Sequence, residues 1–267
     1  WDLEDQYFPP GRFPWPLSWY VKSTCAGLRA WDAATSGRPH ALIANSAHVA
    51  GRIARHYGRE ADVVHPPVEV DRFSAAAGPR EYYLLVGAMA PYKRGELAIE
   101  ACARLGRRLV VAGAGQMAGR LRRLAGPHVE FRDGWVDDAG MSRLYAGARA
   151  VLYPGEEDFG IIVVESLASG CPVIAYGVGG ALETVGRIAA REALERVAEG
   201  GSEAMPGGML FGRQTADSLA EAIRRFEALR FEPATLAALA QPFAAAAFDC
   251  AFREVFERRY AQWRERS

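Results

Sequence analysis

The sequence predicts an α/β fold in which helices cover a mostly parallel sheet. The main indication is residues 150–185, where short apolar runs alternate with glycine-rich loops. Runs of this length are typical of parallel strands that are buried on both faces. The chain has 267 residues and 50% of them are apolar, which is enough for one large or two modest domains.

The first part of the chain predicts an irregular segment followed by a small α/β unit. Residues 1–20 are rich in tryptophan and proline, and they are expected to form loops because proline disrupts helix interiors. A helix is predicted over 21–36. A buried strand over 41–46 would end at a helix N-cap, Asn45 or Ser46. The helix over 47–57 and a strand over 61–67 complete this unit.

A second domain is predicted to start near Arg80. Its first strand, 82–88, leads into a loop with Lys93 and Arg94 and then a helix over 96–106. The next elements are a strand and a glycine-rich turn within 107–121, and a strand and turn over 128–136. A helix then begins after Asp137 or Asp138, because aspartate is a favourable N-cap.

The segment after Gly160 is predicted to be a helix between two parallel strands. Its residues Ile161 to Val164 favour strands by propensity. However, parallel neighbours need a crossover, and Gly170 with a proline shortly after it is typical of a helix C-terminus. A helix here would place Ile161, Val164 and Leu167 on one side.

The region after Val185 is less regular. Residues 186–207 predict a surface insertion with a helical segment followed by loop residues. An amphipathic helix is expected to open at Thr215 and Asp217. Phe248, Phe252 and Phe256 are spaced four apart, which predicts an apolar stripe on a C-terminal helix.

The loops 154–160 and 177–180 indicate a ligand site. Both would lie at the carboxyl edge of the sheet, where open α/β folds bind ligands. Each ends at a helix N-terminus with glycine nearby, which suits phosphate because free N–H groups and the helix dipole attract anions. Glu157 and Glu165 can face one polar ligand from there. This combination predicts a ligand with phosphates and several hydroxyls, such as a nucleotide-sugar.

Three segments in order carry a family resemblance: PYKRGELAIEA, EDFGIIVVE and SGCPVIAYGVGGALETV. They resemble the retaining glycosyltransferases of family 4, which have the GT-B fold, and in particular the mannosyltransferase-like branch. The resemblance covers about residues 40–185 and, more weakly, the rest.

The resemblance implies two Rossmann-like halves. Residues 1–75 would be the C-terminal remnant of the acceptor domain, 76–240 the donor-binding domain, and 241–267 a helix that returns to the first domain. Most of the N-terminal domain, with the family's active-site histidine and most acceptor contacts, would lie before Trp1. The chain alone is therefore expected to bind donor but to transfer poorly.

The resemblance also implies a reaction and its residues. A sugar, with mannose expected, would pass with retention from a GDP- or UDP-linked donor to a glycan or lipid-linked acceptor, without a bound metal or other cofactor. Lys93 and Glu157 would be catalytic. Ala88 stands where many relatives carry a phosphate-binding arginine, and Arg94 is the predicted substitute. The donor-binding residues would be Arg94, Trp135, Val136, Asp158, Phe159, Gly160, Ile161, Glu165, Gly179 and Gly180.

The sequence leaves two other interpretations open. Gly113, Gly115 and Ala118 fit the G-x-G-x-x-A dinucleotide pattern, with Glu130 seventeen residues after Gly113, which would indicate an NAD-dependent oxidoreductase. The pattern follows the domain's second predicted strand, not its first, which weakens this interpretation. Ala88 and the absent half would instead fit a non-catalytic donor-binding fragment.

Composition excludes several classes of function. Basic and acidic residues balance at 32 each, which argues against nucleic acid as a partner. The four cysteines are far apart and form no C-x-x-C motif, so a zinc site or a dithiol redox site is not expected. The expected location is the reducing cytoplasm. No apolar run reaches the roughly 18 residues of a membrane helix, which leaves peripheral membrane contact open.

Overall fold

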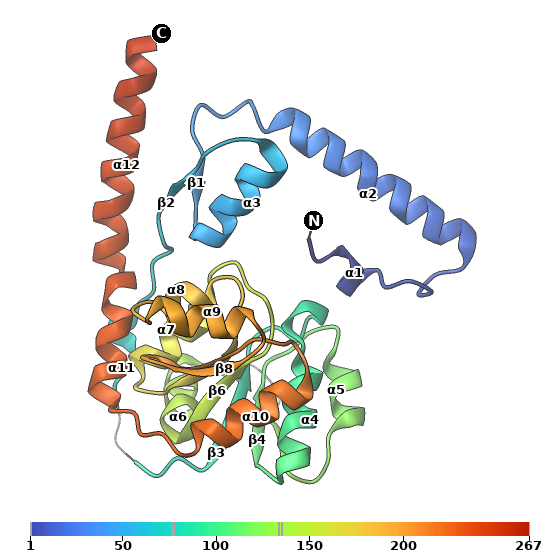
Figure 1. Cartoon of the computed structure of the whole chain (residues 1–267), viewed down its shortest axis with the longest axis vertical. Helices are drawn as coiled ribbons and strands as arrows, with labels where there is room; N and C mark the ends of the chain where they lie inside the picture. The colour runs from blue at the N-terminus through green and yellow to red at the C-terminus, as the bar shows by residue number, and fades with distance from the viewer. Residues whose placement is uncertain (1, 76–77, 133, 135, 267) are drawn as a thin grey trace. The chain divides into compact units, whose positions relative to one another are not determined.

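The computed structural model describes residues 2–75, 78–132, 134 and 136–266, and the chain divides into two compact units. Unit 1 consists of residues 1–64 and 251–267, and unit 2 of residues 65–250 (Figure 1). The domain boundaries implied by the family resemblance, 75/76 and 240/241, stay predictions.

The described residues of unit 1 form two short parallel strands, three complete helices and most of a fourth, α12 (Ala245–Arg266). Ser46 caps α3 by accepting a hydrogen bond from the Val49 amide at 3.0 Å, and Gly58 ends the helix in the left-handed conformation with φ +63°. Both features confirm the predicted helix over 47–57. The elements are α1 (Glu4–Tyr7), α2 (Trp15–Thr35), β1 (Ile43–Ala44), α3 (Ala47–Tyr57) and β2 (Asp62–Val63).

The predicted loop over 1–20 is wrong from Trp15 onward. Helix α2 starts there, with Pro14 as its N-cap residue and Pro16 in its first turn. Proline is tolerated in the first turn because the missing N–H would have no partner inside the helix. The prolines therefore mark the start of the helix and do not exclude it.

Unit 2 is built on a seven-stranded sheet with the order β5-β4-β3-β6-β7-β9-β8. All neighbouring strands are parallel except β8 and β9, which confirms the predicted α/β class. The strands are β3 (Tyr82–Val86), β4 (Leu109–Ala112), β5 (Val129–Arg132), β6 (Ala148–Tyr153), β7 (Val173–Tyr176), β8 (Ser202–Met205) and β9 (Gly208–Phe211).

Helices cover both faces of this sheet (Figure 1). Successive residues of a strand belong to different core clusters, as Val151 and Leu152 of β6 do, because side chains alternate across the sheet. The helices of unit 2 are α4 (Gly95–Leu105), α5 (Ala118–Leu124), α6 (Asp138–Gly147), α7 (Ile161–Ala168), α8 (Ala181–Thr184), α9 (Arg191–Ala198), α10 (Ala216–Phe226) and α11 (Pro233–Ala240), with 3₁₀ turns η1 (Val70–Arg72), η2 (Pro91–Lys93) and η3 (Gln241–Phe243). The first residues of α12 (Ala245–Arg266) also belong to unit 2.

The segment after Gly160 is a helix, as predicted. Gly160 precedes α7 with φ +91°, and Gly170 follows it with φ +66°, a conformation that glycine adopts without strain. Val164 and Leu167 are fully buried, but Ile161 is 46% exposed. Ile161 is the first helical residue, and it does not share the burial of Val164 and Leu167.

The region 186–207 contains a strand that was predicted to be a loop. Residues 202–205 form β8, which pairs antiparallel with β9 through a two-residue connection, Pro206 and Gly207. The predicted helix in this region is α9. The C-terminal phenylalanines lie on α12 as predicted, and their stripe is exposed, since Phe252 is 40% and Phe256 56% accessible.

Candidate functional site

A cavity of about 700 Å³ opens at the carboxyl edge of the sheet. The ends of β3, β4 and β5 supply one side of it, and α6 and α7 supply the other. This is the edge at which open α/β folds bind ligands. The lining residues are Val86, Gly87, Ala88, Ala112, Gly113, Ala114, Gly134, Val136, Asp138, Met141, Tyr145, Ile162 and Glu165.

A second, smaller cavity adjoins the first. Both are lined by Val86, Gly87, Ala88 and Ala112, and the smaller one extends to Lys93. Lys93 and Glu165 therefore lie at one edge of the sheet, on either side of the segment that follows β3.

Glu165 is held by a tyrosine from a neighbouring helix. The Tyr145 hydroxyl in α6 donates a hydrogen bond to Glu165 Oε2 at 3.0 Å, and the Tyr145 side chain is fully buried. Burial raises the pKa of Glu165, and the Tyr145 hydrogen bond and the charge of Arg72 only partly oppose this effect. Glu165 is thus a carboxylate with a neutral partner at the wall of the large cavity.

Lys93 is held by a carboxylate and two aromatic rings. Its ammonium forms an ion pair with Glu157 Oε1 and lies 5.3 Å from the ring centroids of both Tyr92 and Tyr153. Burial raises the pKa of Glu157, which outweighs the opposing attraction of Lys93. The side chains of Lys93 and Glu157 are only 16% and 15% exposed, so their charges act in a poorly screened environment.

Arg94 fixes loops and does not line either cavity. Its Nε donates to Glu96 Oε1 at 2.8 Å and its Nη1 to Gln214 Oε1 at 3.2 Å. Gln214 in turn donates to the Pro154 carbonyl at 3.0 Å, which ties the loop after β3 to the loop after β6. A direct role for Arg94 in donor binding stays a prediction.

Gly179 and Gly180 are required by the neighbouring loop. A Cβ at Gly179 would lie 2.3 Å from the Glu157 carbonyl oxygen, and one at Gly180 would lie 2.2 Å from the Phe159 carbonyl oxygen. The Gly180 amide also donates to the Glu157 carbonyl at 2.8 Å. These contacts hold the backbone on which Glu157 stands, so the two predicted loops come together.

The other predicted residues are scattered around this site. Val136 lines the large cavity, whereas Trp135 lies outside the described residues. Asp158 is exposed, and Phe159 is buried against His65 and Phe243, with ring centroids at 5.5 and 5.3 Å.

Sequence reasoning missed three residues of the site: Tyr145, Tyr153 and Ile162. Ile162, and not Ile161, faces the large cavity. Tyr153 ends β6 at the carboxyl edge, and that position was a usable signal for its contact with Lys93. No local signal marks Tyr145, because its partner is twenty residues away in the next helix.

The glycines of the dinucleotide-like pattern have a structural cause. A Cβ at Gly113 would lie 2.0 Å from the Gly87 carbonyl oxygen, and one at Gly115 would lie 2.5 Å from the Met89 carbonyl oxygen. Glu130 forms an ion pair with Arg108 at 2.8 Å. Arg108 lies just before β4 begins, so this ion pair is at the opposite end of β4 from the glycine turn. Close packing of two loops thus explains the pattern without a dinucleotide.

A parallel sheet with a cavity of this size at its carboxyl edge defines an α/β domain with a candidate ligand site. The sequence profile described as "Glycosyl transferases group 1" matches residues 80–228, and the chain belongs to this family. Among the described residues, no group of three or more histidine, cysteine, aspartate or glutamate side chains is arranged to hold a metal ion.

Curated relatives match the chain over part of their length. The D-inositol 3-phosphate glycosyltransferase of Streptomyces bingchenggensis (strain BCW-1) is 31% identical over 179 residues, which are 54% of this chain and 39% of the relative. That of Mycobacterium sp. (strain KMS) is 34% identical over 147 residues, 45% of this chain and 32% of the relative. The match thus spans about two fifths of these relatives or less, and they are not oxidoreductases.

Solved structures show the same GT-B fold. Sucrose-phosphate synthase from Thermosynechococcus elongatus is similar with a TM-score of 0.68 at 21% identity, over 88% of this chain and 62% of that one. Anabaena HepE in complex with UDP and glucose is similar with a TM-score of 0.64 at 18% identity, over 86% of this chain and 66% of that one. In the described part of the chain, no helix is both long and apolar enough to cross a membrane.

Proposed function

We propose that this chain carries the donor site of a glycosyltransferase that uses a nucleoside-diphosphate sugar. Lys93 binds the diphosphate, Glu165 binds ribose hydroxyls, and Glu157 contacts the donor sugar. The observation that carries the proposal is the convergence of Lys93 and Glu165 on two adjoining cavities that share Gly87 and Ala88.

The chemistry of each side chain matches its proposed partner. A buried ammonium stabilises phosphate oxygens strongly, and a leaving diphosphate accumulates negative charge as the sugar departs. An ionised carboxylate accepts hydrogen bonds and donates none, so Glu165 suits hydroxyl groups. Tyr145 engages Oε2 of Glu165 and leaves Oε1 for the ligand. Val136, Met141 and Ile162 give the large cavity an apolar wall against which a base can pack.

Glu157 changes partners in this proposal. Without ligand it forms the ion pair with Lys93. A bound diphosphate competes for the same ammonium, and Glu157 then accepts hydrogen bonds from the donor sugar. The Gly179 and Gly180 contacts keep the backbone of Glu157 in place while its side chain moves.

The finer specificity follows the motif resemblance. We propose mannose as the transferred sugar, GDP as its carrier, retention at the anomeric carbon, and a glycan or lipid-linked acceptor. The comparisons suggest alternative substrates. The curated relatives are named for inositol 3-phosphate, and one similar structure contains UDP and glucose.

Calorimetry with GDP, UDP and NAD tests the proposal. A nucleoside diphosphate is expected to bind and NAD is not, and the preferred base distinguishes GDP from UDP. The variant Lys93→Met should weaken diphosphate binding by about 10- to 100-fold, the effect of removing a hydrogen bond to a charged group. Lys22→Met is the matched control, because Lys22 is the only other lysine of the chain and lies in unit 1. NAD binding that exceeds diphosphate binding would refute the proposal.

A further inference from the structure

A third cavity, of about 180 Å³, lies at the amino edge of the same sheet, away from the candidate donor site. Arg80 precedes β3, Arg149 is the second residue of β6, and Pro172 precedes β7. Glu227, Leu229 and Arg230, which follow the end of α10, also line the cavity. Its position at the opposite end of the strands separates it from the donor cleft.

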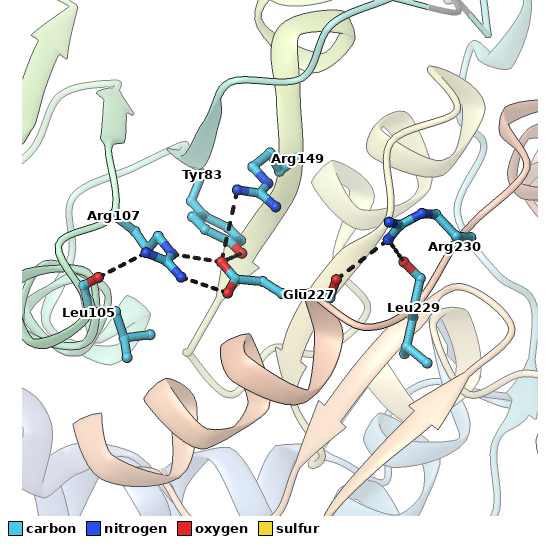
Figure 2. Close-up of polar contacts among 7 residues, drawn as sticks. All are labelled: Tyr83, Leu105, Arg107, Arg149, Glu227, Leu229 and Arg230. Atoms are coloured by element: carbon cyan, nitrogen blue, oxygen red, sulfur yellow. Dashed lines mark hydrogen bonds and ion pairs between the residues drawn. The ribbon is translucent and has the colours of Figure 1, made fainter.

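Glu227 is the acidic residue of this cavity, and its charge is already matched. Arg107 binds it with both arms, Nε to Oε1 at 2.7 Å and Nη2 to Oε2 at 2.8 Å (Figure 2). Tyr83 donates a further hydrogen bond at 3.1 Å. These contacts hold the pKa of Glu227 below its usual value, so it stays ionised and fully compensated by Arg107.

Arg149 and Arg230 add positive charge beyond that of Arg107, and the single carboxylate of Glu227 cannot neutralise all three guanidinium groups. The nearest approach of Arg149 to Glu227 is 3.9 Å, at the limit of an ion pair. Arg230 donates to the carbonyls of Leu229 at 2.9 Å and Glu227 at 3.4 Å, both on its own chain segment (Figure 2). A guanidinium has five N–H donors, so these contacts leave both arginines able to bind an anion.

Arg80 forms the inner wall of the cavity. It donates to the Ala148 carbonyl at 2.8 Å and the Gly170 carbonyl at 2.6 Å, which fixes its guanidinium between the ends of α6 and α7. Its charge therefore stays at the cavity. Phe226 and Phe231 stack with centroids 5.4 Å apart and provide an apolar surface beside the arginines.

We infer that this cavity binds a phosphate monoester with a small apolar or aromatic group. The guanidinium groups of Arg149 and Arg230 bind the phosphate, because their planar forks match its oxygens. The apolar group covers Phe231 and Leu229. The site requires no part of the proposed donor chemistry, and its test is independent of that function.

The probes are phenyl phosphate and inorganic phosphate, titrated by calorimetry into the full chain. The Lys93→Met background prevents binding at the donor cleft from contributing. Phenyl phosphate is expected to bind, and more tightly than inorganic phosphate, because its ring buries apolar surface. Arg230→Gln should weaken it about tenfold or more, as expected for a lost charge-assisted hydrogen bond, and Arg149→Gln should do likewise.

Arg224→Gln is the matched control. Arg224 is an exposed arginine of α10, but it pairs with Glu221 at 2.7 Å and does not line the cavity. Equal weakening by all three substitutions would show general charge screening and overturn the inference. So would unchanged binding in Arg230→Gln, or a signal that sodium chloride of the same ionic strength reproduces.

A last arm identifies the source of the phosphate. Vesicles of phosphatidylcholine with and without phosphatidic acid are sedimented with the chain. Sedimentation that needs phosphatidic acid and Arg230 assigns the site to a lipid phosphate. Binding of phenyl phosphate without such sedimentation assigns it to a soluble ester. Absence of both would overturn the inference.

Discussion

The two ends of the donor cleft hold the two carboxylates of one short segment in different ways. Glu157 and Glu165 are both largely buried, and burial raises the pKa of each. Glu157 is paired with the ammonium of Lys93, whereas Glu165 accepts a hydrogen bond from the neutral hydroxyl of Tyr145. One end is therefore ionic, and the other is held mainly by a neutral hydrogen bond, with a smaller attraction from the charge of Arg72.

This difference separates two kinds of recognition. An ion pair can be replaced by another anion, which makes the Lys93 end suitable for a diphosphate. A carboxylate fixed by a neutral donor keeps its own charge and its free oxygen, which makes the Glu165 end suitable for hydroxyls. Substitutions at one end should then affect phosphate alone, and substitutions at the other should affect only ligands with a ribose.

The largest effect is expected at the ionic end. Lys93→Met should weaken both inorganic pyrophosphate and nucleoside diphosphate by about 10- to 100-fold, because both depend on the ammonium. Glu157→Gln should instead leave their affinity unchanged or increase it, because it removes the anion that competes for Lys93. Calorimetry with the two ligands measures both variants. Similar losses in both variants would show that the pair acts only as a structural unit.

The shared wall between the ends offers a gain of function. Ala88 is exposed and lines both cavities, and the motif resemblance implies a phosphate-binding arginine at its position. Ala88→Arg should strengthen nucleoside-diphosphate binding about tenfold through one charge-assisted hydrogen bond. Ala88→Gln is the uncharged control for side-chain size. An arginine without effect on calorimetric affinity would contradict the proposed path of the diphosphate along Gly87 and Ala88.

A smaller effect is expected at the neutral end. Tyr145→Phe removes the hydroxyl that positions Glu165 and should weaken nucleoside-diphosphate binding by roughly 2- to 10-fold, the effect of one neutral hydrogen bond. Pyrophosphate affinity should not change, because pyrophosphate has no ribose. Tyr176→Phe, a tyrosine that lines neither cavity, serves as control. A loss of pyrophosphate binding in Tyr145→Phe would indicate general damage to the fold.

The smallest effect concerns stability as a function of pH. The pKa of Glu165 is raised, so its ionisation costs stability above its folded-state pKa, and the cost disappears as pH falls toward the ordinary glutamate pKa of 4.5. Glu165→Gln should therefore increase the free energy of unfolding at neutral pH and have little effect below that value. Urea unfolding at several pH values measures this difference.

Glu227 provides the control of opposite sign. Its pKa is lowered, so it contributes stability above the ordinary glutamate pKa of 4.5, and this stability is lost as pH falls through its folded-state pKa. Glu227→Gln should accordingly reduce the free energy of unfolding at neutral pH. If both variants changed stability in the same direction, the difference between their environments would not explain the result.

Local patterns predicted most of the elements. Apolar runs indicated β3, β6 and β7, and Ser46 and Asp137 were recognisable as caps because their side chains bond amides three residues ahead. Strand β8 was not predictable in this way, because its stability depends on pairing with β9. Propensity carries little information where a distant partner decides the conformation.

The site was predictable in outline but not in detail. The spacing of Glu157 and Glu165 and the positions of the glycine-rich loops indicated the carboxyl edge of the sheet, where the large cavity opens. Which isoleucine faces the cavity depends on the rotation of α7 about its axis, and this rotation is set by the residue at which the helix starts. The contact of Tyr145 with Glu165 depends on the packing of two helices and has no signature in either segment.

A crystal structure of the chain with bound nucleoside diphosphate tests the central claim most directly. The two ends of the cleft predict that Lys93 Nζ lies within hydrogen-bonding distance of the diphosphate, that a ribose hydroxyl reaches Glu165 Oε1, and that Glu157 has left Lys93. A nucleotide bound elsewhere, or a diphosphate that leaves the Lys93–Glu157 pair intact, would contradict the claim.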